Sequence, residues 1–251
     1  MSTPSAVLGA AGREETGARS RQRGERNFWG GLALAMAAAA FVGFAPSYYL
    51  KAHFAQGPVL TPLLHLHGAA MSGWIALLII QTSLIRTHHV AWHRRLGVAG
   101  VIYATLLMIL GGVTAIVRAK QGLLGPGDPG PLVFLAIPLM TLIVFPVLMG
   151  AAVYYRRRPD YHKRLVMIGT TEFITAAVGR FPVIGSLGPL AFFPVTDLFL
   201  LAIAIRDWKT LGRLHPATRW GGLLLIVSQP LRLVISGTPA WLAFAKWVTS
   251  G

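Results

Sequence analysis

Runs of apolar residues, separated by short polar loops, constrain this chain more than any other feature of its sequence. A segment of about 20 apolar residues is long enough to cross the hydrocarbon core of a bilayer as a helix. Helices suit such segments because backbone groups in lipid must be hydrogen-bonded internally. The sequence therefore predicts an all-α integral membrane bundle of about seven transmembrane helices, over residues 28–50, 62–85, 93–117, 131–155, 162–184, 189–205 and 219–236.

The two ends of the chain differ from the predicted transmembrane domain, which covers residues 28–236. Residues 1–27 are rich in Ser, Gly, Arg and Glu, a composition that predicts a disordered, basic cytoplasmic tail. Residues 237–251 contain an apolar stretch that is too short to cross a bilayer and that includes Trp241, Lys246 and Trp247. Trp and Lys are enriched at membrane interfaces, so this segment is expected to lie along the membrane surface.

A proline opens three of the predicted spans, at positions 62, 131 and 189. Proline at the first helical position costs no hydrogen bond, so each proline predicts a helix start. Each of the three hairpins then turns through a basic loop that contains a histidine, at positions 93, 162 and 215. The arrangement predicts one helix followed by three hairpins, with a weak internal repeat.

Lysine and arginine are distributed unevenly between the loops. The tail and the loops after the second, fourth and sixth spans hold seventeen of them, in groups of five, three, five and four, whereas the other loops and the C-terminal segment hold four. Cytoplasmic loops carry the excess of these residues in membrane proteins. The sequence therefore predicts a multi-pass protein of the bacterial inner (plasma) membrane, with a cytoplasmic N-terminus, a periplasmic C-terminus and contacts to anionic lipid headgroups.

Composition excludes several function classes. The net charge of +15 suggests nucleic acid binding at first sight, but no basic helix or aromatic platform stands apart from the spans, so no nucleic acid partner is expected. The chain has no cysteine, which excludes disulfides, thiolate nucleophiles and iron–sulfur clusters. Nucleotide-binding and hydrolase motifs are absent as well. No catalytic residue is predicted, and the sequence leaves open whether the chain is an enzyme.

Ionisable residues inside the predicted spans point to a candidate site, because a charge within a bilayer is costly and is usually functional. The candidate ligand-binding residues are His67, Glu172, Arg180, Asp197, Gln229 and Arg232. On the seventh span, Ser228, Gln229, Arg232 and Ser236 recur at three- and four-residue spacing, so they share a face that is expected to look into the bundle. The sequence predicts a polar site in the outer half of the membrane for a small polar or anionic ligand. In the alternative interpretation, the two arginines extend to the membrane surface and Asp197 pairs with one of them for packing.

Three histidines, His93, His162 and His215, lie at the same predicted level, the inner membrane edge. A membrane cytochrome with two axial histidines needs them on two helices at matched depth, so these residues are the candidates for haem or metal binding. They stand beside Arg and Lys at helix starts, where contact with haem propionates is as good an explanation. No other metal site is expected, and the cofactor stays open.

The chain resembles a group of bacterial multi-pass membrane proteins of unknown function. The resemblance rests on His-Arg-Arg-Leu-Gly at 93–97, His-Lys-Arg-Leu at 162–165, His-Pro-Ala-Thr at 215–218 and Ser-Gln-Pro-Leu-Arg at 228–232. It implies the fold and the inner-membrane location, and no activity. Three functions therefore remain as hypotheses: a protein that binds, senses or moves a small ligand, a redox protein that holds haem or quinone, and an accessory subunit of a larger membrane complex. Assembly as an oligomer is compatible with each.

Overall fold

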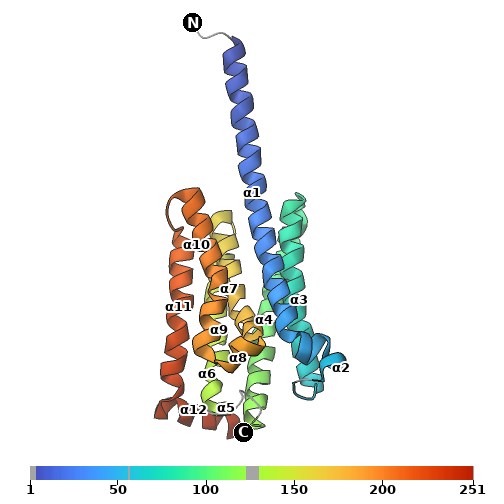
Figure 1. Cartoon of the computed structure of the whole chain (residues 1–251), viewed down its shortest axis with the longest axis vertical. Coiled ribbons are helices and arrows are strands. Elements are labelled where there is room, and N and C mark those ends of the chain that lie inside the picture. The colour runs from blue at the N-terminus through green and yellow to red at the C-terminus, as the bar shows by residue number, and fades with distance from the viewer. Residues whose placement is uncertain (1–3, 56, 123–129, 251) are drawn as a thin grey trace.

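The computed structural model describes residues 4–55, 57–122 and 130–250. The described chain consists of helices joined by short loops and contains no strand (Figure 1). The elements are α1 (Pro4–Phe44), the π-helical turn η1 (Ala45–Tyr49), α2 (Lys51–Phe54), α3 (Pro62–Arg86), α4 (Val90–Lys120), α5 (Pro131–Phe134), α6 (Ala136–Tyr154), α7 (Pro159–Val178), α8 (Pro182–Ser186), α9 (Pro189–Thr196), α10 (Leu198–Leu211), α11 (Pro216–Ser236) and α12 (Pro239–Ser250). The predicted all-α bundle is confirmed.

Five described segments are long and apolar enough to cross a membrane, and α11 with the bent α12 is a sixth. The five are the membrane half of α1 (22–49), α3, α4, the α5–α6 segment (131–154) and the α9–α10 segment (189–211). The sequence predicts about seven spans, and by length and composition the described chain has five or six; α7, the fifth predicted span, is not among them. It is instead the most deeply buried helix, with thirteen buried residues. Its polar side chains from Arg164 to Thr175 therefore face protein, whereas Asp160 at its start is exposed.

The structure differs from the expectation of a disordered tail, because α1 continues as a helix to Pro4 and projects well beyond the bundle (Figure 1). No proline interrupts the chain between Pro4 and Pro46, and the projecting part contains many helix-forming Ala, Glu and Arg residues. The apolar half of α1, which packs against α3 and α7, can thus extend its helical hydrogen bonds outward without a break.

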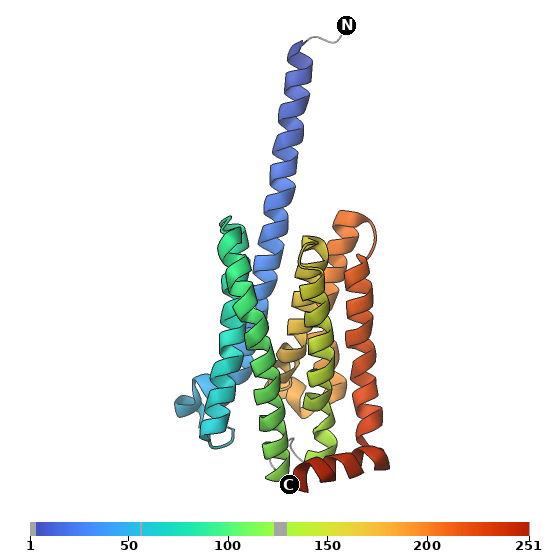
Figure 2. The same ribbon diagram turned by 180° about the vertical axis from the view of Figure 1, so that it is seen from behind.

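The core lies where α6, α7 and α11 pack together, with α1 beside α7, α4 beside α6, and α3 packed against α1 and α4 (Figures 1 and 2). The buried side chains at its centre include Met36, Leu148, Ile168, Ile174, Ile203 and Leu225. Helices α1 and α7 approach closely at Gly43, where a Cβ atom would stand 2.2 Å from the carbonyl oxygen of Ala177. Any larger residue at position 43 would push these two helices apart.

Prolines and helix breaks position several polar residues. Pro62, Pro131 and Pro189 each occupy the start of a helix, as predicted. The fifth span ends earlier than expected, at Val178 rather than residue 184, because Gly179 and Pro182 follow it and the chain restarts as the short α8. Asp197 lies at the junction between α9 and α10. At that junction its side chain can turn toward α11.

The last helix, α12, is bent by 83° from α11 and lies across the end of the bundle opposite the projecting part of α1 (Figure 2). It packs against α4 and α5, and Trp241 Nε1 donates a hydrogen bond to the carbonyl oxygen of Leu132 at 2.9 Å. Trp247 remains 72% exposed. The 83° bend gives α12 a direction unlike that of the spans, as expected of a segment that lies along the membrane surface.

Candidate functional site

A buried ion pair lies at the centre of the bundle, between α7 and α11. Arg232 Nη2 contacts Glu172 Oε1 at 2.6 Å, and both side chains are only 1% exposed. Arg232 Nη2 also donates to Ser228 Oγ at 2.9 Å, and Thr141 Oγ1 from α6 donates to Glu172 Oε2 at 2.9 Å. Three helices therefore meet at one charge-assisted network.

The local sequence of α11 explains why these groups converge. Ser228, Gln229, Arg232 and Ser236 are all buried, so the predicted polar face does look into the bundle. The guanidinium carbon of Arg232 lies 5.8 Å from the ring centroid of Phe193 on α9. Arg232 Nε is buried and has no hydrogen-bond partner among the described residues. This face of α11 therefore holds a fixed cation, Arg232, whose Nε–H group is an unused hydrogen-bond donor.

A second carboxylate adjoins this pair. Gln229 Nε2 donates to Asp197 Oδ1 at 2.8 Å, and this amide is the hydrogen-bond partner that the structure gives the Asp197 side chain. Asp197 is half-buried and lies close enough to Glu172 for the two carboxylates to interact electrostatically. We call Glu172, Asp197, Gln229 and Arg232, with Thr141 and Ser228, the central polar site. In their ionised forms, its acids outnumber its bases by two to one.

Two predicted site residues lie elsewhere. Arg180 is exposed, its Nη1 donates to the carbonyl oxygen of Ala176 at 2.5 Å, and its guanidinium carbon lies 4.4 Å from the ring centroid of Phe44. Because α7 ends before Arg180, the side chain turns back over the last turn of that helix. His67 is half-buried near Arg180, and its Nδ1 has no partner among the described residues. The structure therefore brings together four of the six predicted residues.

Sequence reasoning missed a second buried ion pair at the opposite end of α7. Arg164 Nη2 contacts Asp207 Oδ1 at 2.5 Å, with the two side chains 3% and 0% exposed. Asp207 Oδ2 also accepts hydrogen bonds from His215 N at 3.1 Å and Thr218 Oγ1 at 2.5 Å. One signal was available: Asp207 is the single acid between residues 206 and 219, among four cations. We call Arg164, Asp207, His215 and Thr218 the loop clamp.

The ring of His215 packs within this clamp. It lies 4.5 Å from the ring of Tyr161, and its Nδ1 accepts a hydrogen bond from Ala217 N at 3.1 Å. Partial burial and the nearby Arg164 charge lower the pKa of His215 below its usual range. This shift favours the neutral ring, whose Nδ1 accepts the hydrogen bond that caps the start of α11.

The structure brings His93 and His162 together, with ring centroids 6.2 Å apart. His162 Nδ1 lies 2.9 Å from the carbonyl oxygen of Ala152 and donates a hydrogen bond to it. The Gln81 side-chain amide, oriented so that both its nitrogen and its oxygen are hydrogen-bonded, donates to His93 Nδ1 at 2.7 Å. The Nδ1 atoms of both rings are therefore engaged in hydrogen bonds. Within the described chain, no three His, Asp or Glu side chains are placed to hold a metal ion.

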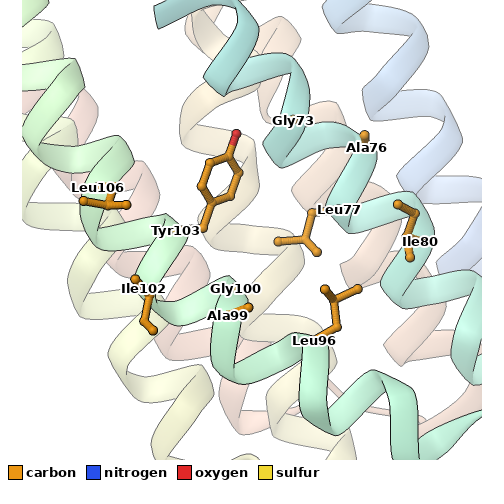
Figure 3. A pocket seen from close by; sticks show the side chains of 10 residues that line it. All are labelled: Gly73, Ala76, Leu77, Ile80, Leu96, Ala99, Gly100, Ile102, Tyr103 and Leu106. Carbon is orange, nitrogen blue, oxygen red and sulfur yellow. The ribbon is translucent and has the colours of Figure 1, made fainter. Parts of the chain in front are cut away.

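An apolar groove of about 460 Å³ runs between α3 and α4 (Figure 3). Its lining includes Gly73, Ala76, Ala99 and Gly100, whose small side chains leave the space open. Tyr103 carries the only polar side-chain atom among the ten lining residues, and its hydroxyl donates to the carbonyl oxygen of Ala70 at 2.5 Å. The groove therefore offers no charge or free donor, and it is separate from the central polar site.

No family model, no curated protein and no solved structure matches this chain.

Proposed function

We propose that the chain is a multi-pass protein of the bacterial inner membrane and that it binds a proton at the central polar site. The membrane-length helices support insertion into a bilayer. The acid excess at the site supports a proton over an anionic ligand, because Glu172 already neutralises Arg232 at 2.6 Å. An anion entering this site would meet a second carboxylate, that of Asp197.

The orientation follows from the basic loops. The α3–α4, α6–α7 and α10–α11 loops lie at the end of the bundle from which α1 projects (Figure 1). The positive-inside rule assigns that end to the cytoplasm. A reporter enzyme that is active only in the periplasm should therefore be active when fused after Ser250 or Gln121, and inactive after Pro159 or Gly212. Activity at Pro159 would contradict the orientation.

The observation that carries the proton assignment is the environment of Asp197. Its only hydrogen-bond partner within the described residues is a neutral amide at 2.8 Å, and no cation pairs with it there. A carboxylate in a membrane interior without a cation is expensive and is usually neutralised. Protonation neutralises Asp197 and leaves its Oδ1 able to accept from Gln229.

Release of that proton would place two negative charges beside one guanidinium. The unused Nε of Arg232 is then a donor that the ionised Asp197 can recruit, while Nη2 stays with Glu172. Because Arg232 is on α11 and Asp197 is at the α9–α10 junction, this new contact would shift α11 relative to that junction. The site therefore couples protonation to helix position, as sensing or moving a proton requires.

Infrared difference spectroscopy across a pH titration, on the protein in liposomes, tests this proposal. The carbonyl band of a protonated, buried carboxyl group should appear in the wild type and be lost in Asp197→Asn. Asp160→Asn is the matched control, because Asp160 is a 68% exposed carboxylate at the start of α7. A wild-type spectrum without a band that depends on Asp197 would refute proton binding. A proton flux into the same liposomes, lost in Asp197→Asn, would show that the protein moves the proton.

A further inference from the structure

An open pocket of about 310 Å³ lies at the turn between α6 and α7, away from the central polar site. It is lined by Tyr154, Tyr155, Arg157 and Arg158. The turn joins two helices of the bundle, at the end where the basic loops gather (Figure 1). In the proposed orientation this is the level of the cytoplasmic lipid headgroups.

Two guanidinium groups at this pocket have no acidic partner. Arg157 and Arg158 are exposed, and neither forms an ion pair within the described part of the chain. The adjacent acid, Asp160, is engaged by Lys163 at 2.8 Å and lies 4.0 Å from Arg164. The two cations of the pocket therefore remain available to an external anion.

Aromatic rings line the rest of the pocket, and a further ring packs against them. The rings of Tyr154 and Tyr155 meet edge to face at a centroid distance of 4.9 Å, and Tyr155 stacks on Tyr161 at 4.7 Å. The guanidinium carbon of Arg158 lies 6.0 Å from the ring centroid of Tyr161. Stacked rings restrict the turn, and the following Pro159 fixes its backbone further. The two arginines thus project from an ordered base.

We propose that this pocket binds a phosphate group, carried either by an anionic phospholipid or by a soluble phosphate compound. Arginine binds phosphate oxygens through two parallel N–H donors, and a tyrosine hydroxyl can donate a further hydrogen bond. The pocket volume is at the small end of ligand sites, which suits one phosphate-bearing head rather than a large molecule. The inference rests on the proposed orientation only for which leaflet supplies the phospholipid. Phosphate binding itself does not depend on that orientation.

The experiment measures binding to the purified full chain by native mass spectrometry and by the shift in melting temperature. The probes are dioleoyl phosphatidylglycerol, dioleoyl phosphatidylcholine and sodium phosphate. Arg157→Gln/Arg158→Gln should bind the recognised probe about tenfold more weakly or worse, because it loses two charge-assisted donors. Arg94→Gln/Arg95→Gln is the matched control, since it removes two adjacent exposed arginines from the start of α4, at the same end of the bundle.

The outcomes separate the two sources of phosphate. Loss of phosphatidylglycerol binding with no effect of sodium phosphate identifies a lipid headgroup, whereas stabilisation by sodium phosphate alone identifies a soluble ligand. Equal losses in both double variants would reveal unspecific charge attraction and overturn the proposal. Full binding by Arg157→Lys/Arg158→Lys would overturn it as well, because lysine keeps the charge and lacks the paired donors. Unchanged melting of each variant without probe verifies that it folds.

Discussion

Replacing Arg232 by leucine alone should destabilise the bundle by about 3–5 kcal/mol, because the substitution leaves the buried Glu172 carboxylate without its cation. Glu172→Leu should cost a similar amount for the converse reason. The double variant should recover much of the loss, since two apolar residues of similar volume avoid the cost of burying charge. Melting curves of the four proteins in one detergent measure the coupling between the two positions.

Arg180→Leu is the matched control for this cycle. It makes the same substitution at an exposed arginine whose hydrogen bond goes to a backbone carbonyl, so little change in melting temperature is expected. Coupling of the Arg232 and Glu172 substitutions by more than about 0.5 kcal/mol would show that they act as one unit. Simple additivity would mean that the 2.6 Å contact contributes no specific stabilisation, and the central polar site would lose its anchor.

The polar face of α11 could be predicted from the sequence, but the partner of Arg232 could not. The spacing of Ser228, Gln229 and Arg232 fixes them on one side of a helix whatever packs against it. Which acid meets the guanidinium depends on how α7 and the α9–α10 segment are rotated about their axes. Glu172 and Asp197 both have a depth near the middle of the bundle, so depth alone cannot distinguish them.

Arg180 shows a different limit of the sequence argument. Its distance along the chain from Glu172 suggests the same helix and a similar environment, but α7 ends at Val178. Arg180 therefore does not share a helical face with Glu172, and its guanidinium group packs on the ring of Phe44 instead. Gly179 and Pro182 carried the signal for this break, since glycine and proline often follow a helix end.

The loop clamp was missed because charged loop residues are usually solvated, and their burial depends on tertiary packing. The sequence around Asp207 is typical of an exposed helix end, with Arg206 and Lys209 beside it. In the structure its carboxylate is 0% exposed and joins α7, α10 and α11. The clamp closes the same end of the bundle that the basic loops occupy, and it ties α7 to α10 and α11 there.

The second large effect is therefore expected at this clamp. Asp207→Asn keeps the size of the side chain and removes its charge, which leaves the 3% exposed Arg164 with only the exposed Asp160, at 4.0 Å, as a counter-ion. The expected loss is about 3–5 kcal/mol, as for other broken buried pairs. Asp160→Asn, on the exposed side of α7, is the control and should shift the melting temperature little.

An apolar replacement of the whole pair should restore less stability here than at Glu172 and Arg232. The double variant Arg164→Leu/Asp207→Leu removes the charges, but it also strands His215 N and Thr218 Oγ1, whose hydrogen bonds go to Asp207 Oδ2. Each unsatisfied buried donor costs about 1–3 kcal/mol. Adding Thr218→Val to the double variant removes one of the two donors and should recover part of the loss. If the double variant is already as stable as the wild type, the clamp is only an ion pair, and the His215 and Thr218 contacts contribute nothing to the packing of α11.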